Sequence, residues 1–408
     1  MPPGQNVTPD ASSAAAHRNR LAWSTAIFAL ATGLSRILGL VREVVAAYYF
    51  GVAGKINAFT VAFQIPNLVR ALVADAALSS AFVPVFSELL EKGDRKRAWR
   101  VASTLFWLML LGLGGLTALF ILLAPLLMRP FHPVDLNLSV GLSRLLFPIV
   151  TLLGVSGIVV GILNSYEHFS VPALTPVFWN LAIIAGLAIG VPHAGTEDAK
   201  LYVYAGAILA GTVIQVLLPI PWLRGRDDRL RMVIDWRDPA VAQTFKLMIP
   251  VTLGLGLINV NAVVDTLFAS RLIDRDLAPA AIDKAFRLYM LPQGMFSVAI
   301  ATVLFPSLAR LSARRDMDGF RHTVGLGIRQ IAFLLVPASV ISAVLAEPIV
   351  RLVYQRGDDR CLARVERAFF SLQSNWIPTW VALGNLFVNG VLDAVFYRFG
   401  IWGIPLAT

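Results

Sequence analysis

The chain contains a series of apolar runs of about 20 residues or more, each long enough for a helix to cross the hydrocarbon core of a bilayer. Backbone amides inside a membrane must bond to one another, so runs of this length fold as helices. Hydrophobic residues make up 57% of the chain and charged residues only 15%, which excludes an ordinary soluble domain. We therefore predict an all-α polytopic membrane protein. The predicted spans lie near 21–48, 57–91, 98–128, 139–164, 172–191, 200–222, 239–271, 281–312, 323–346 and 376–396.

Basic residues gather in short loops between these runs. The loops at 92–100, 224–237 and 310–321 are the richest, and all three fall on one side of the membrane if the helices alternate. Because cytoplasmic loops carry an excess of Lys and Arg, we expect the N-terminus to be cytoplasmic. This topology explains the net charge of +10 without a nucleic-acid partner. The basic segment 347–367 is an exception, since alternation places it outside.

The two ends of the chain differ from its middle. Residues 1–20 are expected to form a disordered cytoplasmic tail, because the first 17 are small, polar and proline-containing. Residues 400–408 begin a further apolar run. The single cysteine, Cys361, excludes an intrachain disulfide and lies in no metal or redox motif.

A repeat divides the chain. The segment "AFVPVFSELLEKGDRKRAW" at 81–99 is echoed by "VLFPSLARLSARRDMDGFR" at 303–321, with a proline and an aspartate at matching places. Internal repeats with broken helices are typical of secondary transporters, whose binding sites lie between the repeats near the midplane. We therefore expect an N-terminal lobe at 21–237 and a C-terminal lobe from 238 to 408.

Charged residues inside the predicted spans mark a candidate site. Four arginines there exceed the neighbouring acids, Glu43 and Asp75, by two charges. A surplus of buried positive charge suits a polyanionic ligand, and guanidinium binds phosphate through a planar fork of donors. The alternative for any one arginine is snorkelling to the interface, or pairing of Arg42 with Asp75 or Glu43. The four arginines are Arg36, Arg42, Arg70 and Arg287.

A second, weaker candidate lies in the span at 239–271. Asp265 with Asn259 or Asn261 forms a candidate cation or proton site, although a polar contact between helices explains these residues more simply. The chain has no P-loop, and its five histidines have no metal-ligand spacing. The sequence thus favours a transporter over an enzyme, with neither a cofactor nor a metal centre.

Four segments together resemble the MurJ/MviN lipid II flippases of bacteria, which belong to the multidrug/oligosaccharidyl-lipid/polysaccharide exporter superfamily. The resemblance implies a two-lobe, inverted-V transporter in the bacterial inner membrane. It would move the undecaprenyl-pyrophosphate-linked peptidoglycan precursor to the outer leaflet by alternating access, coupled to membrane potential, Na⁺ or H⁺. The cell-wall synthesis machinery is an implied partner. The segments are "GLSRILGLVREVVAAYYFG", "NAFTVAFQIPNLVRALVADAALSSAFVPVFSELLEKGD", "GILNSYEHFSVPALTPVFWN" and "FRLYMLPQGMFSVAIATVLFPSLAR".

The resemblance also implies roles for the four arginines. Arg36 and Arg42 match the arginines of the family's SRxxGxxRD/E segment, in which Glu43 is the acid. Arg70 matches the basic residue after PNL, and Arg287 matches the arginine of the YADRL segment. All four would line the central cavity and bind pyrophosphate.

Several residues depart from the family pattern. Asn57 and Gln64 stand where the family commonly has an acid and a base. The resemblance implies that this pair acts in gating, and in this chain the pair has lost both charges. Asp75 stands where Glu is usual, and Phe286 replaces the acid before Arg287.

The helix count is also short, with about ten of the family's fourteen spans, which suggests a truncated and internally deleted chain. Two alternatives therefore stay open beside lipid II flipping. One is export of another polyprenyl-linked glycan or of a drug, and the other is a non-transporting, degenerate membrane scaffold.

Overall fold

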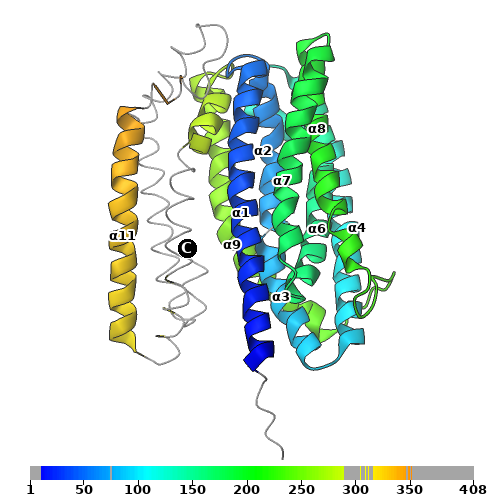
Figure 1. The fold of residues 1–408 in the computed structure, drawn as a ribbon. Helices are drawn as coiled ribbons and strands as arrows, with labels where there is room; N and C mark the ends of the chain where they lie inside the picture. The colour runs from blue at the N-terminus through cyan, green and yellow to red at the C-terminus, as the bar shows by residue number, and fades with distance from the viewer. Residues whose placement is uncertain are drawn as a thin grey trace, which may run out of the picture.

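The computed structural model describes residues 11–73, 76–288, 304, 308, 311, 316–345, 348–349 and 351, and these are almost entirely helical (Figure 1). Short helical turns extend several of the helices, and residues 278–288 are also helical. The helices are α1 (Ala11–Phe50), α2 (Ile56–Val73), α3 (Ala76–Glu91), α4 (Arg95–Met128), α5 (Leu136–Leu146), α6 (Pro148–Ser165), α7 (Ser170–Ala185), α8 (Glu197–Leu217), α9 (Pro239–Phe268) and α11 (Met317–Val344).

Five described stretches are long and apolar enough to cross a membrane, which confirms the polytopic prediction. One of them joins α5 and α6 across a break at Phe147 and Pro148, because proline at the first position of α6 cannot donate to the preceding turn. The five stretches are Arg95–Phe131, Leu136–Ser165, Ser170–His193, Glu197–Leu223 and Met317–Ser342.

The observed boundaries differ from the predicted ones at two places. Residues 11–20, expected in the tail, are helical and extend α1, whereas residues 1–10 lie outside the described residues. The predicted span 57–91 is described as α2 and α3, on either side of residues 74 and 75, which also lie outside the description. Most of the predicted span 281–312 and all of 376–396 fall outside it too.

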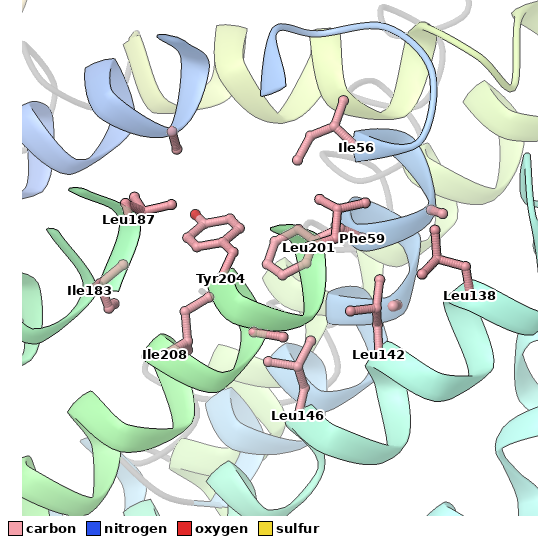
Figure 2. Packing of buried hydrophobic residues seen from close by; sticks show 14 of the residues in the cluster. Ile56, Phe59, Leu138, Leu142, Leu146, Ile183, Leu187, Leu201, Tyr204 and Ile208 are labelled. Atoms are coloured by element: carbon pink, nitrogen blue, oxygen red, sulfur yellow. The ribbon is translucent and has the colours of Figure 1, made fainter. Parts of the chain in front are cut away.

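A buried apolar cluster joins α1, α2, α5, α7 and α8 (Figure 2). Tyr204 of α8 lies at its centre, with its ring stacked 4.6 Å from that of Phe59 on α2 and 5.6 Å from that of Phe50 at the end of α1. Because three helices place aromatic rings at one point, their ends are fixed relative to one another.

The start of α9 is tied to the start of α4. Asp238 caps α9 by accepting a hydrogen bond from the amide of Ala240, and Pro239 follows at the first helical position. The guanidinium of Arg97 on α4 donates two hydrogen bonds of 2.9 Å to the same carboxylate. From there α9 packs along α2 and α3, whereas α11 lies to one side of the bundle (Figure 1).

We predict that Gly161→Ala destabilises the contact between α6 and α3. A Cβ at Gly161 would come within 2.6 Å of the buried ring of Phe82, so this ring would have to shift. Overpacking of this kind typically costs about 1–3 kcal/mol, and thermal unfolding of the purified chain in detergent measures it. The matched control is Gly115→Ala on α4, where a Cβ meets nothing within 4 Å. Equal midpoints for the two variants would contradict the prediction.

We also predict that Asp238 makes stability depend on pH. The hydrogen bonds from Arg97 lower the pKa of Asp238 below its usual value. Its contribution is therefore fully present above the ordinary aspartate pKa of about 3.9 and is lost as pH falls through the lowered pKa. Thermal midpoints of the chain and of Asp238→Asn should accordingly differ most at neutral pH and converge under acid. A constant difference at all pH values would count against this assignment.

Candidate functional site

A buried ion cluster forms where α1 meets the helical segment 278–288. One carboxylate, that of Glu43 on α1, lies between several cations. Its Oε1 is 2.7 Å from a guanidinium nitrogen of Arg42 and 3.0 Å from one of Arg287. Its Oε2 lies 2.7 Å from Nζ of Lys284. The structure thus brings together three of the predicted site residues and adds a lysine.

The cluster contains two residues that the sequence analysis missed. Lys284 and Asp283 both lie within one helical turn of Arg287. Their spacing in the sequence could therefore have indicated that they share a helix face with the arginine. Asp283 accepts a hydrogen bond of 2.9 Å from Nε of Arg287. Phe286 stands where the family has an acid before the arginine. In this chain Asp283, one helical turn before Arg287, provides a carboxylate instead.

Cations outnumber carboxylates in the described part of the cluster. Among the residues that the structure describes, the three cations Arg42, Lys284 and Arg287 contact two carboxylates, those of Glu43 and Asp283. The side chains of Glu43 and Lys284 are only 7% and 9% exposed, whereas that of Arg287 is 35% exposed. Buried charges at this density need partners on every side, and Arg287, which contacts both carboxylates, lies on the more accessible edge.

The side chain of Arg42 is held by α7. Its second terminal nitrogen donates to Oδ1 of Asn180 at 3.1 Å, and the guanidinium lies 4.7 Å from the centre of the Trp179 ring. Asn180 is oriented in turn by its bond to the carbonyl of Pro176. The Nε of Arg42 is buried and has no hydrogen-bond partner among the described residues. The guanidinium is therefore positioned with one donor unused.

Asn57 joins the α1–α2 connection to the start of the segment 278–288. Its side-chain nitrogen lies 2.6 Å from the carbonyl oxygen of Asp276 and 3.2 Å from those of Val52 and Gly54. Its Oδ1 accepts a hydrogen bond of 2.8 Å from the amide of Ala280. A carboxylate could not donate to these carbonyl oxygens, so the departure from the family's acid produces a neutral link. We call these bonds the Asn57 link.

The other predicted residues on α1 and α2 lie outside the cluster. Arg36 is exposed, because α1 continues without a break and residues six apart on a helix point about 120° away from each other. Arg36 and Arg42 therefore point to different sides of α1, and the role of Arg36 in the central cavity stays a prediction. Arg70 bonds to Asn67 one turn earlier on α2, and Gln64 is half-buried on the same helix.

The candidate cation site stays a prediction. Asp265 is half-buried on α9, whereas the side chain of Asn261 and the whole of Asp75 lie outside the described residues. Within the described part of the chain, no three His, Cys, Asp or Glu side chains gather as a metal site.

We predict that Glu43→Gln strongly destabilises the contact between α1 and residues 278–288. The substitution leaves three cations without their shared carboxylate, and removal of one partner from a buried ion pair typically costs about 3–5 kcal/mol. Thermal unfolding of the chain in detergent checks it. The control is Glu88→Gln, which breaks the exposed pair with Lys92 and should cost less than about 1 kcal/mol. If Glu43→Gln unfolds at the same temperature as the control, the carboxylate does not hold the cluster together.

Curated relatives share much of this sequence. A probable lipid II flippase MurJ of Vibrio cholerae is 34% identical over 431 residues, an alignment that covers 95% of this chain and 80% of the relative. The corresponding Haemophilus influenzae protein is 33% identical over 360 residues, covering 80% of this chain and 67% of the relative.

Solved structures share the fold. A lipid II flippase MurJ in an inward closed conformation is 24% identical with a TM-score of 0.69, covering 93% of this chain and 84% of its own. An inward-facing MATE transporter of the MOP superfamily is 17% identical with a TM-score of 0.64, covering 93% and 89%. The sequence model of the family described as lipid II flippase MurJ matches residues 46–359. This chain, with its apolar spans and its ion cluster around Glu43, therefore belongs to the lipid II flippase MurJ family.

Proposed function

We propose that this chain moves the undecaprenyl-pyrophosphate-linked peptidoglycan precursor, lipid II, from the cytoplasmic to the outer leaflet of the bacterial inner membrane. Membership of the family supports the reaction, and the ion cluster around Glu43 supports the binding chemistry. The single observation that carries the proposal is the set of three cations around one buried carboxylate, that of Glu43.

Pyrophosphate would bind by competing with this carboxylate. Arg287 is the most accessible of the three cations around Glu43, and Arg42 retains an unused buried donor at Nε. Both guanidinium groups present planar forks that fit phosphate oxygens, and both stay ionised when water is excluded. A pyrophosphate bound to Arg42 and Arg287 would weaken their attraction to Glu43.

That competition suggests a gating mechanism. The bonds from Glu43 to Lys284 and Arg287 hold α1 against the segment 278–288, and the Asn57 link lies nearby. Both features lie toward the end of the bundle where α1 ends, opposite the basic turn between α3 and α4 (Figure 1). Substrate that draws the arginines away from Glu43 would loosen this end, and so favour outward opening.

The topology and the energy source complete the proposal. The N-terminus and the loops at 92–100 and 224–237 would face the cytoplasm, where basic loops are retained. No cofactor is needed, and the membrane potential or a Na⁺ or H⁺ gradient would drive the cycle, with Asp265 and Asn261 as a candidate site for the ion. The flipped lipid would then pass to the cell-wall synthesis machinery.

We predict that Arg287→Ala reduces the rate of lipid II flipping in reconstituted vesicles by at least about tenfold, because a hydrogen bond to a charged group typically contributes about 1.5–3 kcal/mol. Arg42→Ala should behave alike. Flipping is measured as the protection of fluorescent lipid II from an added, membrane-impermeant reductant.

The matched control is Arg129→Gln, which removes an exposed arginine just after α4. Its flipping rate should equal that of the unchanged chain. An unaltered rate in Arg287→Ala would overturn the proposed binding site. No flipping by the unchanged chain, under conditions where a longer relative flips, would favour the scaffold alternative.

A further inference from the structure

The connection between α8 and α9 contains an irregular segment, residues 229–237, that is fixed along the first turns of α4. The amide of Arg231 donates to Oγ of Ser103 at 3.1 Å, and the amide of Asp235 donates to Oγ1 of Thr104 at 3.0 Å. The indole of Trp107 donates to the carbonyl of Arg231 at 3.0 Å. Backbone groups of the segment therefore meet side chains of α4 at regular intervals, and its position is defined.

The length of α4 places this segment at the membrane surface. At 1.5 Å per residue, its 34 residues extend about 51 Å, whereas the hydrocarbon core is about 30 Å thick. The sequence of α4 is polar and basic up to Arg100 and apolar from Leu105 onward. The contacts with Ser103, Thr104 and Trp107 thus lie at the level where α4 enters the bilayer.

Large apolar side chains of this segment are exposed. Met232 is 81% exposed, Trp236 is 73% exposed and Ile234 is 49% exposed. They lie at every second position of a nonhelical stretch, and all three are exposed on the surface beside α4. Together with the indole of Trp107, Trp236 forms the kind of aromatic belt that membrane proteins place at the headgroup level.

Arginines flank these apolar side chains. Three of the four acids between α8 and α9 pair within the protein: Asp227 with Arg95, Asp228 with Arg231 and Asp238 with Arg97. Asp235 forms no ion pair with a described residue. Arg229 and Arg237 are exposed and likewise form no ion pair with any residue that the structure describes. Two unpaired guanidinium groups at the headgroup level would attract anionic lipid.

We propose that residues 229–237 form a binding surface for the anionic phospholipid headgroups of the leaflet at this end of the bundle. Met232, Ile234 and Trp236 insert at the glycerol level, while Arg229 and Arg237 bind lipid phosphates. The occupant is lipid because the segment is fixed to α4 where that helix meets the membrane, so lipid is its immediate neighbour. Since the segment continues into Asp238, the cap of α9, bound lipid also holds the link between α8 and α9 in place.

The first test locates the segment in the bilayer. In the full chain with Cys361 replaced (C361S), a bimane fluorophore is attached at M232C and the chain is reconstituted in phosphatidylcholine–phosphatidylglycerol vesicles. Lipid with a nitroxide high on its acyl chain should quench this fluorophore several-fold more than one attached at K92C, in the exposed turn between α3 and α4. Equal, weak quenching at both positions would overturn the proposal. Quenching that disappears as the protein-to-lipid ratio rises would assign the surface to a second copy of the chain, which also overturns it.

The second test measures lipid preference. Affinity for phosphatidylglycerol over phosphatidylcholine, measured by native mass spectrometry, should fall by about fivefold for each arginine removed in Arg229→Gln and Arg237→Gln. Arg129→Gln, which removes an exposed arginine at the other end of α4, should leave this preference unchanged. An undiminished preference in the double variant, with its thermal midpoint unaltered, would contradict the assignment of the two arginines.

Discussion

The arrangement of the site depends on one buried carboxylate that holds three cations. Glu43 is the shared partner of Arg42 from its own helix and of Lys284 and Arg287 from a segment more than 200 residues later. Each charge would be costly to bury alone, so the groups are stable only as a set. This requirement brings α1 and residues 278–288 together, alongside the apolar cluster that contains Ala46 and Ala280. The same set, with three cations around one carboxylate, is the basis of the proposed binding of an anion.

Much of the fold could be predicted from the sequence because the chain lies in lipid. A solvent without hydrogen bonds leaves the backbone few solutions, so apolar runs of sufficient length predict helices directly. The run around 139–164 nevertheless contains a break at Pro148, and residues 11–20 extend α1 despite a polar composition. These details depend on local geometry and on flanking polar residues, and the length of an apolar run gives no information about either.

The site was predictable only in part, for a different reason. Arg42, Glu43 and Arg287 were indicated because a charge inside an apolar run is conspicuous. The partners that orient them were not, since Asn180 is 138 residues from Arg42 and Lys284 is 241 from Glu43. Arg36, whose role in the cavity stays a prediction, shows that residue type alone does not place a side chain in the cluster around Glu43. Its charge and its motif resembled those of Arg42, but its place on a continuous helix directs it elsewhere. Residue type thus predicted the chemistry of the site, whereas the position of each residue around its helix decides which residues belong to the cluster.

The neutrality of the Asn57 link separates two kinds of resistance to opening. Its bonds join amides to carbonyl oxygens and carry no net charge, so an electric field across the membrane exerts no force on them. The cluster around Glu43 does carry charge, and displacement of one elementary charge through the full potential corresponds to about 2.3 kcal/mol per 100 mV. In the proposed cycle, the two neighbouring contacts would respond to different variables. The Asn57 link would resist separation of the helices equally at any membrane potential, whereas the resistance of the cluster would vary with the potential.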